Sequence, residues 1–205
     1  MVTVTIADAW PRHGQEFTIE DLDRMPDDGH RYELLDGSLI VSPAPGLPHQ
    51  RVAAVLIVLL ELACPDDLVV FPNVNVRFGA LTALEPDAVV ARSPGVSGPR
   101  LVDTPLLVAE ILSPDSAMRD LNLKKAAYER FGVPSYWVID PDLDQPSLQA
   151  FELADGAYAE VAHVTGGEVF TAQRPFAVEI APGRLVAKLR TGRGARTSEG
   201  DGGLE

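Results

Sequence analysis

Four ionisable residues stand where the neighbouring sequence is apolar or forms turns: Glu33, Asp87, Glu110 and Lys124. Glu110 lies in the middle of the apolar run 106–112, and an ionised carboxylate is rarely buried without a cation, a metal or a proton beside it. Asp87 stands at the head of another apolar run, 88–90. If the two runs form neighbouring strands, the two carboxylates meet at one edge of a sheet.

Two carboxylates that converge in this way suit a hard divalent cation. Mg²⁺ binds carboxylate, carbonyl, water and phosphate oxygens, so we expect the backbone carbonyl of Ile111 to join Asp87 and Glu110 as a ligand. Mg²⁺ or Mn²⁺ at this place would polarise a phosphoryl oxygen and lower the pKa of an attacking water. Glu33 is a further carboxylate for positioning that water.

The elements that must hold these residues follow from apolar periodicity. Residues 106–112 and 135–140 are predicted strands, and residues 117–131 are a predicted helix that ends at Gly132 and Pro134. Two apolar strands joined by a helix indicate a crossover whose strands run parallel. The stretch 106–140 is therefore the framework around which the candidate site is built.

The predicted helix carries Asp120, Lys124 and Tyr128 four residues apart, on one face. Asp120 precedes Lys124 in the favourable order for an ion pair. Lys124 would then point toward the carboxylates and stabilise developing negative charge. The alternative is that Asp120 and Lys124 form an ordinary solvated pair on the helix surface.

The rest of the chain predicts a mixed α+β domain. Residues 31–41 have the pattern of a β-hairpin around Asp36 and Gly37, residues 49–63 that of a helix, and residues 147–180 that of an antiparallel β-meander. The predicted strand at 147–153 could be an exposed edge that pairs with a second copy in a homodimer. We expect an N-terminal arm at 1–16, one domain at 17–189 and a disordered tail at 190–205.

Composition limits the classes of function. A net charge of −13 argues against broad electrostatic affinity for nucleic acid. The single cysteine, Cys64, excludes an internal disulfide framework and a Cys-rich zinc site, and is typical of a cytoplasmic protein. The longest apolar run, 52–63, is too short to span a bilayer, so no membrane association is expected.

The ordered set of motifs resembles the Uma2 family, also called DUF820, over about residues 17–180. The matching segments are Tyr32–Gly37, Pro48–Gln50, Glu85–Asp87, Val108–Pro114, Asp120 to Tyr128, and Gly132–Pro141. That family is similar to the PD-(D/E)XK, or restriction-endonuclease-like, superfamily. The resemblance implies a central mixed sheet flanked by helices, and a Mg²⁺-dependent nuclease site acting on nucleic acid, with DNA the expected substrate.

Carried over residue by residue, the resemblance makes Asp87 and Glu110 the metal carboxylates, Glu33 the N-terminal acid and Lys124 the catalytic lysine. The chain departs from the superfamily pattern, because the residue two positions after the acid is Leu112 and not lysine. The family's lysine stands on the next helix, where Lys124 is found, and the long lysine stem permits this.

Several alternatives remain open at this point. His49 precedes a helix, where a structural role is more common than a ligand role, although its motif makes it a supporting residue of the site. Glu33 could face solvent on an edge strand. A binding module that retains the fold without catalysis, and a hydrolase of a small phosphoester with a closed pocket, are alternatives to the nuclease.

Overall fold

The computed structural model describes residues 16–93, 98, 100–113 and 119–194, with side chains for all of these except residues 119–121 and 191–194. The strands of the larger sheet are β3 (Leu68–Pro72), β6 (Ala88–Arg92), β7 (Leu107–Ile111), β8 (Ser135–Asp140), β9 (Ser147–Ala154) and β10 (Ala157–Thr165). The strands of the smaller sheet are β1 (Arg31–Leu35), β2 (Ser38–Ser42), β4 (Val76–Arg77) and β5 (Ala83–Leu84). A separate hairpin is formed by β11 (Phe170–Ala172) and β12 (Val178–Ile180).

The helices are α1 (Ile19–Leu22), α2 (Leu47–Ala63), the π-helix η3 (Arg119–Lys124), α3 (Lys125–Arg130) and α4 (Pro182–Gly194). The helix predicted at 117–131 therefore corresponds to η3 followed directly by α3. None of the helices in the described part of the chain is both long and apolar enough to cross a membrane.

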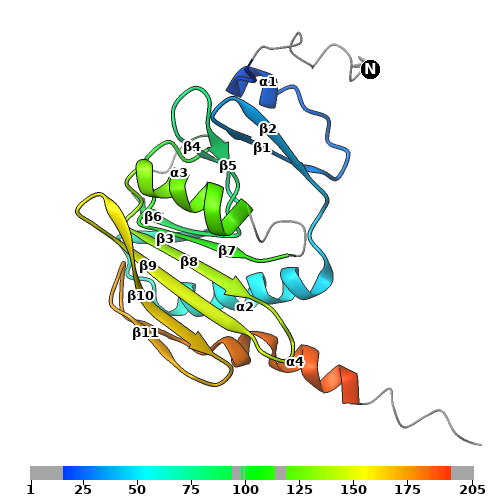
Figure 1. Ribbon diagram of the computed structural model, residues 1–205, viewed down its shortest axis with the longest axis vertical. Coiled ribbons are helices and arrows are strands. Elements are labelled where there is room, and N and C mark those ends of the chain that lie inside the picture. Colours follow the sequence, from blue (N-terminus) through cyan, green and yellow to red (C-terminus); the bar gives the residue numbers. More distant parts are fainter. Residues whose placement is uncertain (1–15, 94–97, 99, 114–118, 195–205) are drawn as a thin grey trace, which may run out of the picture.

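The larger sheet has the order β10-β9-β8-β7-β6-β3 and the smaller one the order β2-β1-β5-β4. In the larger sheet β7 and β8 run parallel, and the other neighbouring strands run antiparallel. Figure 1 shows the small sheet beside α3 and the large sheet beneath this helix. The predicted crossover and the predicted mixed-sheet fold are both confirmed.

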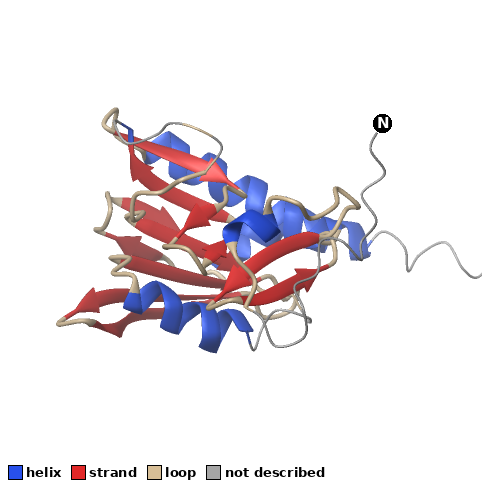
Figure 2. Ribbon diagram, turned by 90° about the horizontal axis from the view of Figure 1, so that it is seen from above, coloured by secondary structure: helices blue, strands red, loops and turns tan. Residues whose placement is uncertain are grey.

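Helices cover both faces of the large sheet (Figure 2). Side chains alternate between the faces of a strand. Ala109 and Trp137 thus pack with α2 on one face, while their neighbours Val108 and Tyr136 pack with α3 on the other. Two residues beyond Val108, Glu110 lies on the α3 face. The alternation therefore directs this carboxylate toward the helix that carries the candidate lysine.

The small sheet is built on the predicted β-hairpin, which is confirmed. Asp36 has φ +48° and Gly37 has φ +74°, as a two-residue turn of type I′ requires. Leu34 packs under α1 on one face of β1. By the same alternation, Arg31 and Glu33 share the opposite face, and β1 lies between β2 and β5 rather than at the edge.

Two predictions about the edges of the fold are wrong. The strand predicted as an exposed edge for a second copy is β9, which pairs with β8 on one side and β10 on the other, because the turn at Asp155 and Gly156 folds β10 back along it. The tail was predicted to be disordered from residue 190, but residue 190 lies within α4. Leu185 and Val186 of this helix are buried in the core that α2 also forms. The remainder of that tail, 195–205, and residues 1–15 of the predicted arm lie outside the described residues.

Candidate active site

Asp87 and Glu110 lie across from each other at the meeting of β6 and β7. These strands pair antiparallel with Ala88 opposite Ala109, so the register extended by one residue sets Asp87 opposite Glu110. Residues directly opposite in antiparallel strands have their side chains on the same face. Both side chains are buried, with each residue 1% exposed. The predicted convergence of the two carboxylates is therefore present.

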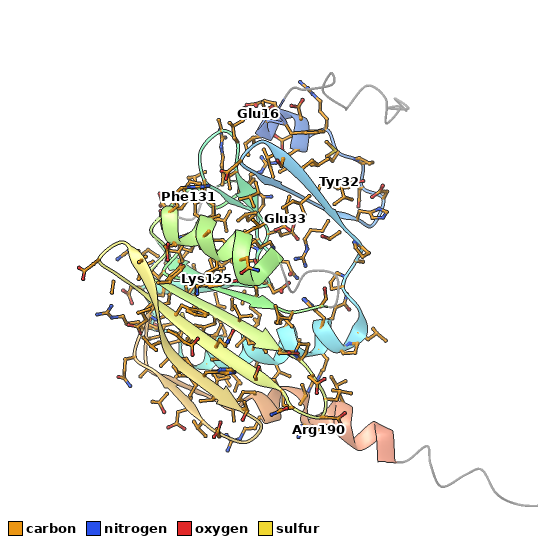
Figure 3. All side chains as sticks on the ribbon, in the orientation of Figure 1. Glu16, Tyr32, Glu33, Lys125, Phe131 and Arg190 are labelled. Carbon is orange, nitrogen blue, oxygen red and sulfur yellow. The ribbon has the colours of Figure 1, made fainter. Side chains whose placement is uncertain are left out.

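Lys124 connects Glu110 to the small sheet. Its Nζ lies 3.0 Å from Glu110 Oε1 and 2.9 Å from Glu33 Oε1, and the residue is only 2% exposed. Figure 3 shows Glu33 where the small sheet meets the helix. The alternatives of a solvated lysine and a solvent-facing Glu33 are both wrong. A single ammonium group instead bridges two buried carboxylates from different sheets.

The helix reaches this position through a wide turn. Lys124 is the last residue of the π-helix η3, and Tyr128 follows in α3. The Tyr128 hydroxyl donates a 2.8 Å hydrogen bond to the same Glu110 Oε1 that Lys124 contacts. Short π-helical turns are frequent at functional sites. Lys124 and Tyr128 share a face as predicted, whereas the side chain of Asp120 lies outside the described residues.

Burial, and after it the negative charge of Glu110, raises the pKa of Tyr128 well above its ordinary value. The hydroxyl therefore remains protonated and donates throughout the neutral range. Because Lys124 and Tyr128 both bind Oε1, the Glu110 carboxylate is held in one orientation.

Asp87 is held by three donors from three different elements. Arg31 Nη2 lies 3.1 Å from Oδ1, His49 Nε2 lies 3.1 Å from Oδ2, and the Ile111 backbone N–H donates to Oδ2 at 2.8 Å. Burial opposes ionisation, but the hydrogen bond from His49, then its charge and that of Arg31, lowers the pKa of Asp87 below its usual value. Asp87 is thus ionised at neutral pH, and His49 supports it as a positioning residue.

The pairing of Arg31 with Asp87 was not predicted, although Arg31 was named among the basic residues that could line a groove. Arg31 stands two residues before Glu33 and so had to share that residue's face. Burial is the largest single influence and opposes the charge of Arg31, but the neighbouring carboxylates, first Asp87 and then Glu33 and Glu110, together outweigh burial and raise the pKa of Arg31.

Glu85 also joins the two sheets, through its backbone. Its N–H donates to Glu33 Oε1 at 2.8 Å, and its carbonyl accepts from Arg31 Nη1 at 3.2 Å. Burial raises the pKa of the Glu85 side chain. The peptide just before Asp87 therefore fixes the small sheet to the head of β6.

The donor set can be compared with what a divalent cation needs. The carboxylates of Glu33 and Glu110 contact Lys124, and that of Asp87 contacts Arg31 and His49. Among the described residues, no group of three or more His, Cys, Asp or Glu is arranged to hold a metal ion. Mg²⁺ commonly uses one or two carboxylates and completes its shell with waters and phosphate. The residues therefore fit a cation that substrate completes, and not a closed protein cage.

Two cavities flank Asp87. One of about 500 Å³ is lined by Arg31 and Glu85, among others, and one of about 430 Å³ is lined by His49. They share Pro45, Gln50 and Asn73 in their linings. Several lining side chains, including Gln50 and Asn73, are exposed. Glu33, Asp87, Glu110 and Lys124 line neither of these two cavities, so the hydrolase of a small phosphoester stays an alternative.

A family model described as "Putative restriction endonuclease", Uma2, matches residues 19–186. The chain belongs to the Uma2 family. Among solved structures, it is similar to a crystal structure described as that of a "putative nuclease belonging to DUF820" from Anabaena variabilis ATCC 29413, with a TM-score of 0.67 at 18% identity. The match covers 84% of this chain and 99% of that one, and at this identity it shows the fold. No curated protein matches the chain.

Membership of Uma2 supports a nuclease-like function at the level of the family description. In this Uma2 protein, Leu112 follows Glu110 by two residues, where the superfamily pattern has lysine. Lys124 reaches Glu110 from the following helical element, with Nζ 3.0 Å from Oε1. The catalytic role of Lys124 and the Ile111 carbonyl ligand both stay predictions.

Proposed function

We propose that this protein is a metal-dependent nuclease that hydrolyses phosphodiester bonds in nucleic acid, with DNA as the substrate. The observation that carries the proposal is the buried Lys124 ammonium held between Glu33 and Glu110, with Asp87 on the same face of the neighbouring strand. A charge arrangement that costs this much desolvation is typical of sites with shifted acid–base properties. Family membership points in the same direction.

Each residue has a role that its contacts support. Asp87 and Glu110 would hold Mg²⁺ or Mn²⁺, which supplies a polarised phosphoryl oxygen and an activated water. Lys124 is placed to stabilise the negative charge that develops on the phosphate. Glu33, on the other side of Lys124, would orient the attacking water.

The remaining residues hold the proposed metal ligands and the substrate in position. Tyr128 fixes the rotamer of Glu110 through its 2.8 Å hydrogen bond. His49 and the Ile111 N–H fix Asp87. Arg31 forms an ion pair with Asp87 and also lines the larger cavity. It is therefore placed to bind a phosphate of the substrate strand.

Mn²⁺ titration by calorimetry tests the metal site. Wild type is compared with Glu110→Gln, which keeps the size and removes the charge, and with Glu61→Gln, the same change at an exposed position of α2. We expect wild type and Glu61→Gln to bind alike and Glu110→Gln to bind at least about tenfold more weakly. Equal binding by all three would contradict the assignment of Glu110 as a ligand.

The ion pairing of the site favours a second candidate, a binding module that retains the fold without turnover. Lys124 and Arg31 already bind the carboxylates, and the net charge of −13 gives phosphate no general attraction. Under this candidate, wild type cleaves no nucleic acid with any divalent metal, and a variant carrying Asp87→Ala and Glu110→Ala retains its partner. Loss of binding together with cleavage would count against it.

A further inference from the structure

The partners of Asp87 separate it from solvent. The residue is 1% exposed and lines neither of the two cavities that flank it. Arg31 contacts Asp87 Oδ1 and lines the larger cavity, whereas His49 contacts Oδ2 and lines the smaller one. A cation that enters from either cavity therefore has to pass one of these two side chains before it reaches Asp87.

The two oxygens of Asp87 differ in how firmly they are held. Oδ2 accepts the Ile111 backbone N–H at 2.8 Å and lies 3.1 Å from His49 Nε2. The Ile111 N–H belongs to β7 and cannot turn away from the carboxylate. Among the described residues, Oδ1 has Arg31 as its one hydrogen-bonding partner, at 3.1 Å. Oδ1 is therefore the oxygen whose partner can be exchanged.

Arg31 is a side chain that can move away from Asp87. Its side chain is 15% exposed and borders a cavity of about 500 Å³. Nη2 binds Asp87, while Nη1 donates to the carbonyl of Glu85, another residue of the cavity lining. The planar fork of a guanidinium matches a phosphate as well as it matches a carboxylate. The group that now binds Asp87 is thus equally suited to a phosphate in the cavity.

A guanidinium and a divalent cation compete for the same oxygen. Both would lie within a few ångströms of each other if they bound Oδ1 together, and like charges repel strongly where little water screens them. A phosphate in the larger cavity offers Arg31 a second charged partner with the same hydrogen-bonding geometry. Phosphate binding therefore offsets the loss of the Arg31–Asp87 contact.

We propose that Arg31 is an exchangeable partner of Asp87, which leaves Oδ1 when a divalent cation binds there and then binds a phosphate of the substrate strand in the larger cavity. Metal and nucleic acid bind cooperatively under this proposal, because both favour the same position of Arg31. The inference rests on the proposed nuclease function, since it concerns the metal site and the substrate of that function. It makes claims about binding that are tested without cleavage.

Mn²⁺ titration by calorimetry, without nucleic acid, tests the competition. Wild type is compared with Arg31→Gln and with Arg100→Gln, the same change at an arginine of the same lining that pairs with Asp23. We expect Arg31→Gln to bind Mn²⁺ at least about tenfold more tightly than wild type, as for a guanidinium that leaves Asp87 about one tenth of the time. Arg100→Gln should bind like wild type. Equal or weaker binding by Arg31→Gln, or the same gain in Arg100→Gln, would overturn the proposal.

Fluorescence anisotropy tests the second partner of Arg31. The probe is a labelled DNA duplex with phosphorothioate linkages, which resist cleavage. In EDTA, wild type and Arg31→Gln should bind the probe alike, because Asp87 holds Arg31. In Mn²⁺, wild type should bind at least about fivefold more tightly than Arg31→Gln, which is the lower end of typical couplings between sites, and Arg100→Gln should match wild type. The same difference in EDTA and in Mn²⁺, or no binding of the probe in either, would contradict the exchange.

A measurement on wild type covers the case in which circular dichroism shows Arg31→Gln to be poorly folded. The guanidinium signal of Arg31 is followed by nuclear magnetic resonance during a Mg²⁺ titration, and is identified by its absence from the spectrum of Arg31→Lys. The signal should shift along the same binding curve that calorimetry gives for Mg²⁺. An Arg31 signal that is unchanged at saturating Mg²⁺ would refute its displacement.

Failure of the exchange is distinct from failure of the proposed metal site. A wild type that binds Mn²⁺ and loses this binding in Glu110→Gln, with no gain in Arg31→Gln, keeps the metal site and excludes the exchange. A protein that binds no Mn²⁺ as wild type or as any of these variants loses both.

Discussion

Replacing Lys124 by methionine tests the electrostatic core of the site. Methionine keeps most of the apolar stem but removes the ammonium that lies 2.9 Å from Glu33 and 3.0 Å from Glu110. Two buried carboxylates would then lie close together without the ammonium, although the Tyr128 hydroxyl still donates to Glu110 and the Glu85 N–H still donates to Glu33. Removing one partner of a buried ion pair costs about 3–5 kcal/mol. We expect a loss of unfolding free energy in this range for Lys124→Met.

Two companion variants should differ in stability from Lys124→Met. Glu110→Gln leaves Lys124 paired with Glu33, so it should cost less, about 1.5–3 kcal/mol for the weakened charged hydrogen bonds. Adding Glu110→Gln to Lys124→Met removes one of the two carboxylate charges that the ammonium no longer balances. The double variant should therefore be more stable than Lys124→Met alone, with a positive coupling of at least about 1 kcal/mol.

Urea unfolding at pH 7, followed by far-ultraviolet circular dichroism, supplies the free energies. Measurements are made in EDTA, so that no metal stabilises the carboxylates. A loss below about 1 kcal/mol for Lys124→Met, or additive costs in the double variant, would refute the account, because it would mean that Lys124 is not the counter-ion that both carboxylates require.

Three further outcomes follow from the structure. The pKa of Tyr128 is raised in the folded state. The stability that depends on its neutral hydroxyl is therefore complete below about pH 10 and falls by up to about 1.4 kcal/mol per pH unit above it. In urea unfolding across pH 8–11, Tyr128→Phe should lack this loss of stability at high pH. The pKa of Asp87 is lowered in the folded state. Its ionised carboxylate therefore contributes to stability above the ordinary aspartate pKa of about 4, and this contribution is lost as the pH falls through the lower pKa of the folded state. The difference in unfolding free energy between wild type and Asp87→Asn should narrow between about pH 5 and pH 2. Gly132 has φ +74°, and a Cβ added there would meet no other residue within 4 Å. Gly132→Ala should therefore cost only the backbone strain of about 1–2 kcal/mol, and an unchanged melting temperature would argue against that conformation.

The candidate site was accessible from the sequence because its residues broke a pattern. Glu110 interrupts an apolar strand, and no soluble fold leaves such a residue unpaired. Apolar runs predicted its partner strand, and Gly132 and Pro134 marked the end of the crossover helix. The shared face of Asp87 and Glu110 depends in addition on the register in which Ala88 pairs with Ala109, which the sequence pattern does not give.

Other parts of the site depend on contacts that local pattern does not encode. The division into two sheets depends on β5, which has two residues (Ala83–Leu84) and gives no periodic signal. Arg31 alternates with Glu33, but its partner Asp87 lies on the other sheet. The π-helical turn that ends at Lys124 has no sequence signature of its own. Each of these features is set by tertiary packing between segments far apart in the chain.

The end of the fold shows the same limit. Gly and Arg residues near 190 indicated a disordered tail, yet Leu185, Val186 and Leu189 recur at helical spacing and pack toward α2. Burial of these three side chains outweighs the poor helix propensity of the sequence that follows. Local composition therefore predicted the wrong beginning for the tail.

Cleavage of DNA by the purified protein is the most direct test of the proposed function. Supercoiled plasmid and single-stranded circular DNA are incubated with Mg²⁺, with Mn²⁺ or with EDTA, using wild type, Glu110→Gln and the exposed control Glu61→Gln. We expect cleavage that requires the divalent metal and is retained by Glu61→Gln. Cleavage should fall at least about a hundredfold in Glu110→Gln, although that variant remains folded. Cleavage that persists in Glu110→Gln, or continues in EDTA, would contradict it.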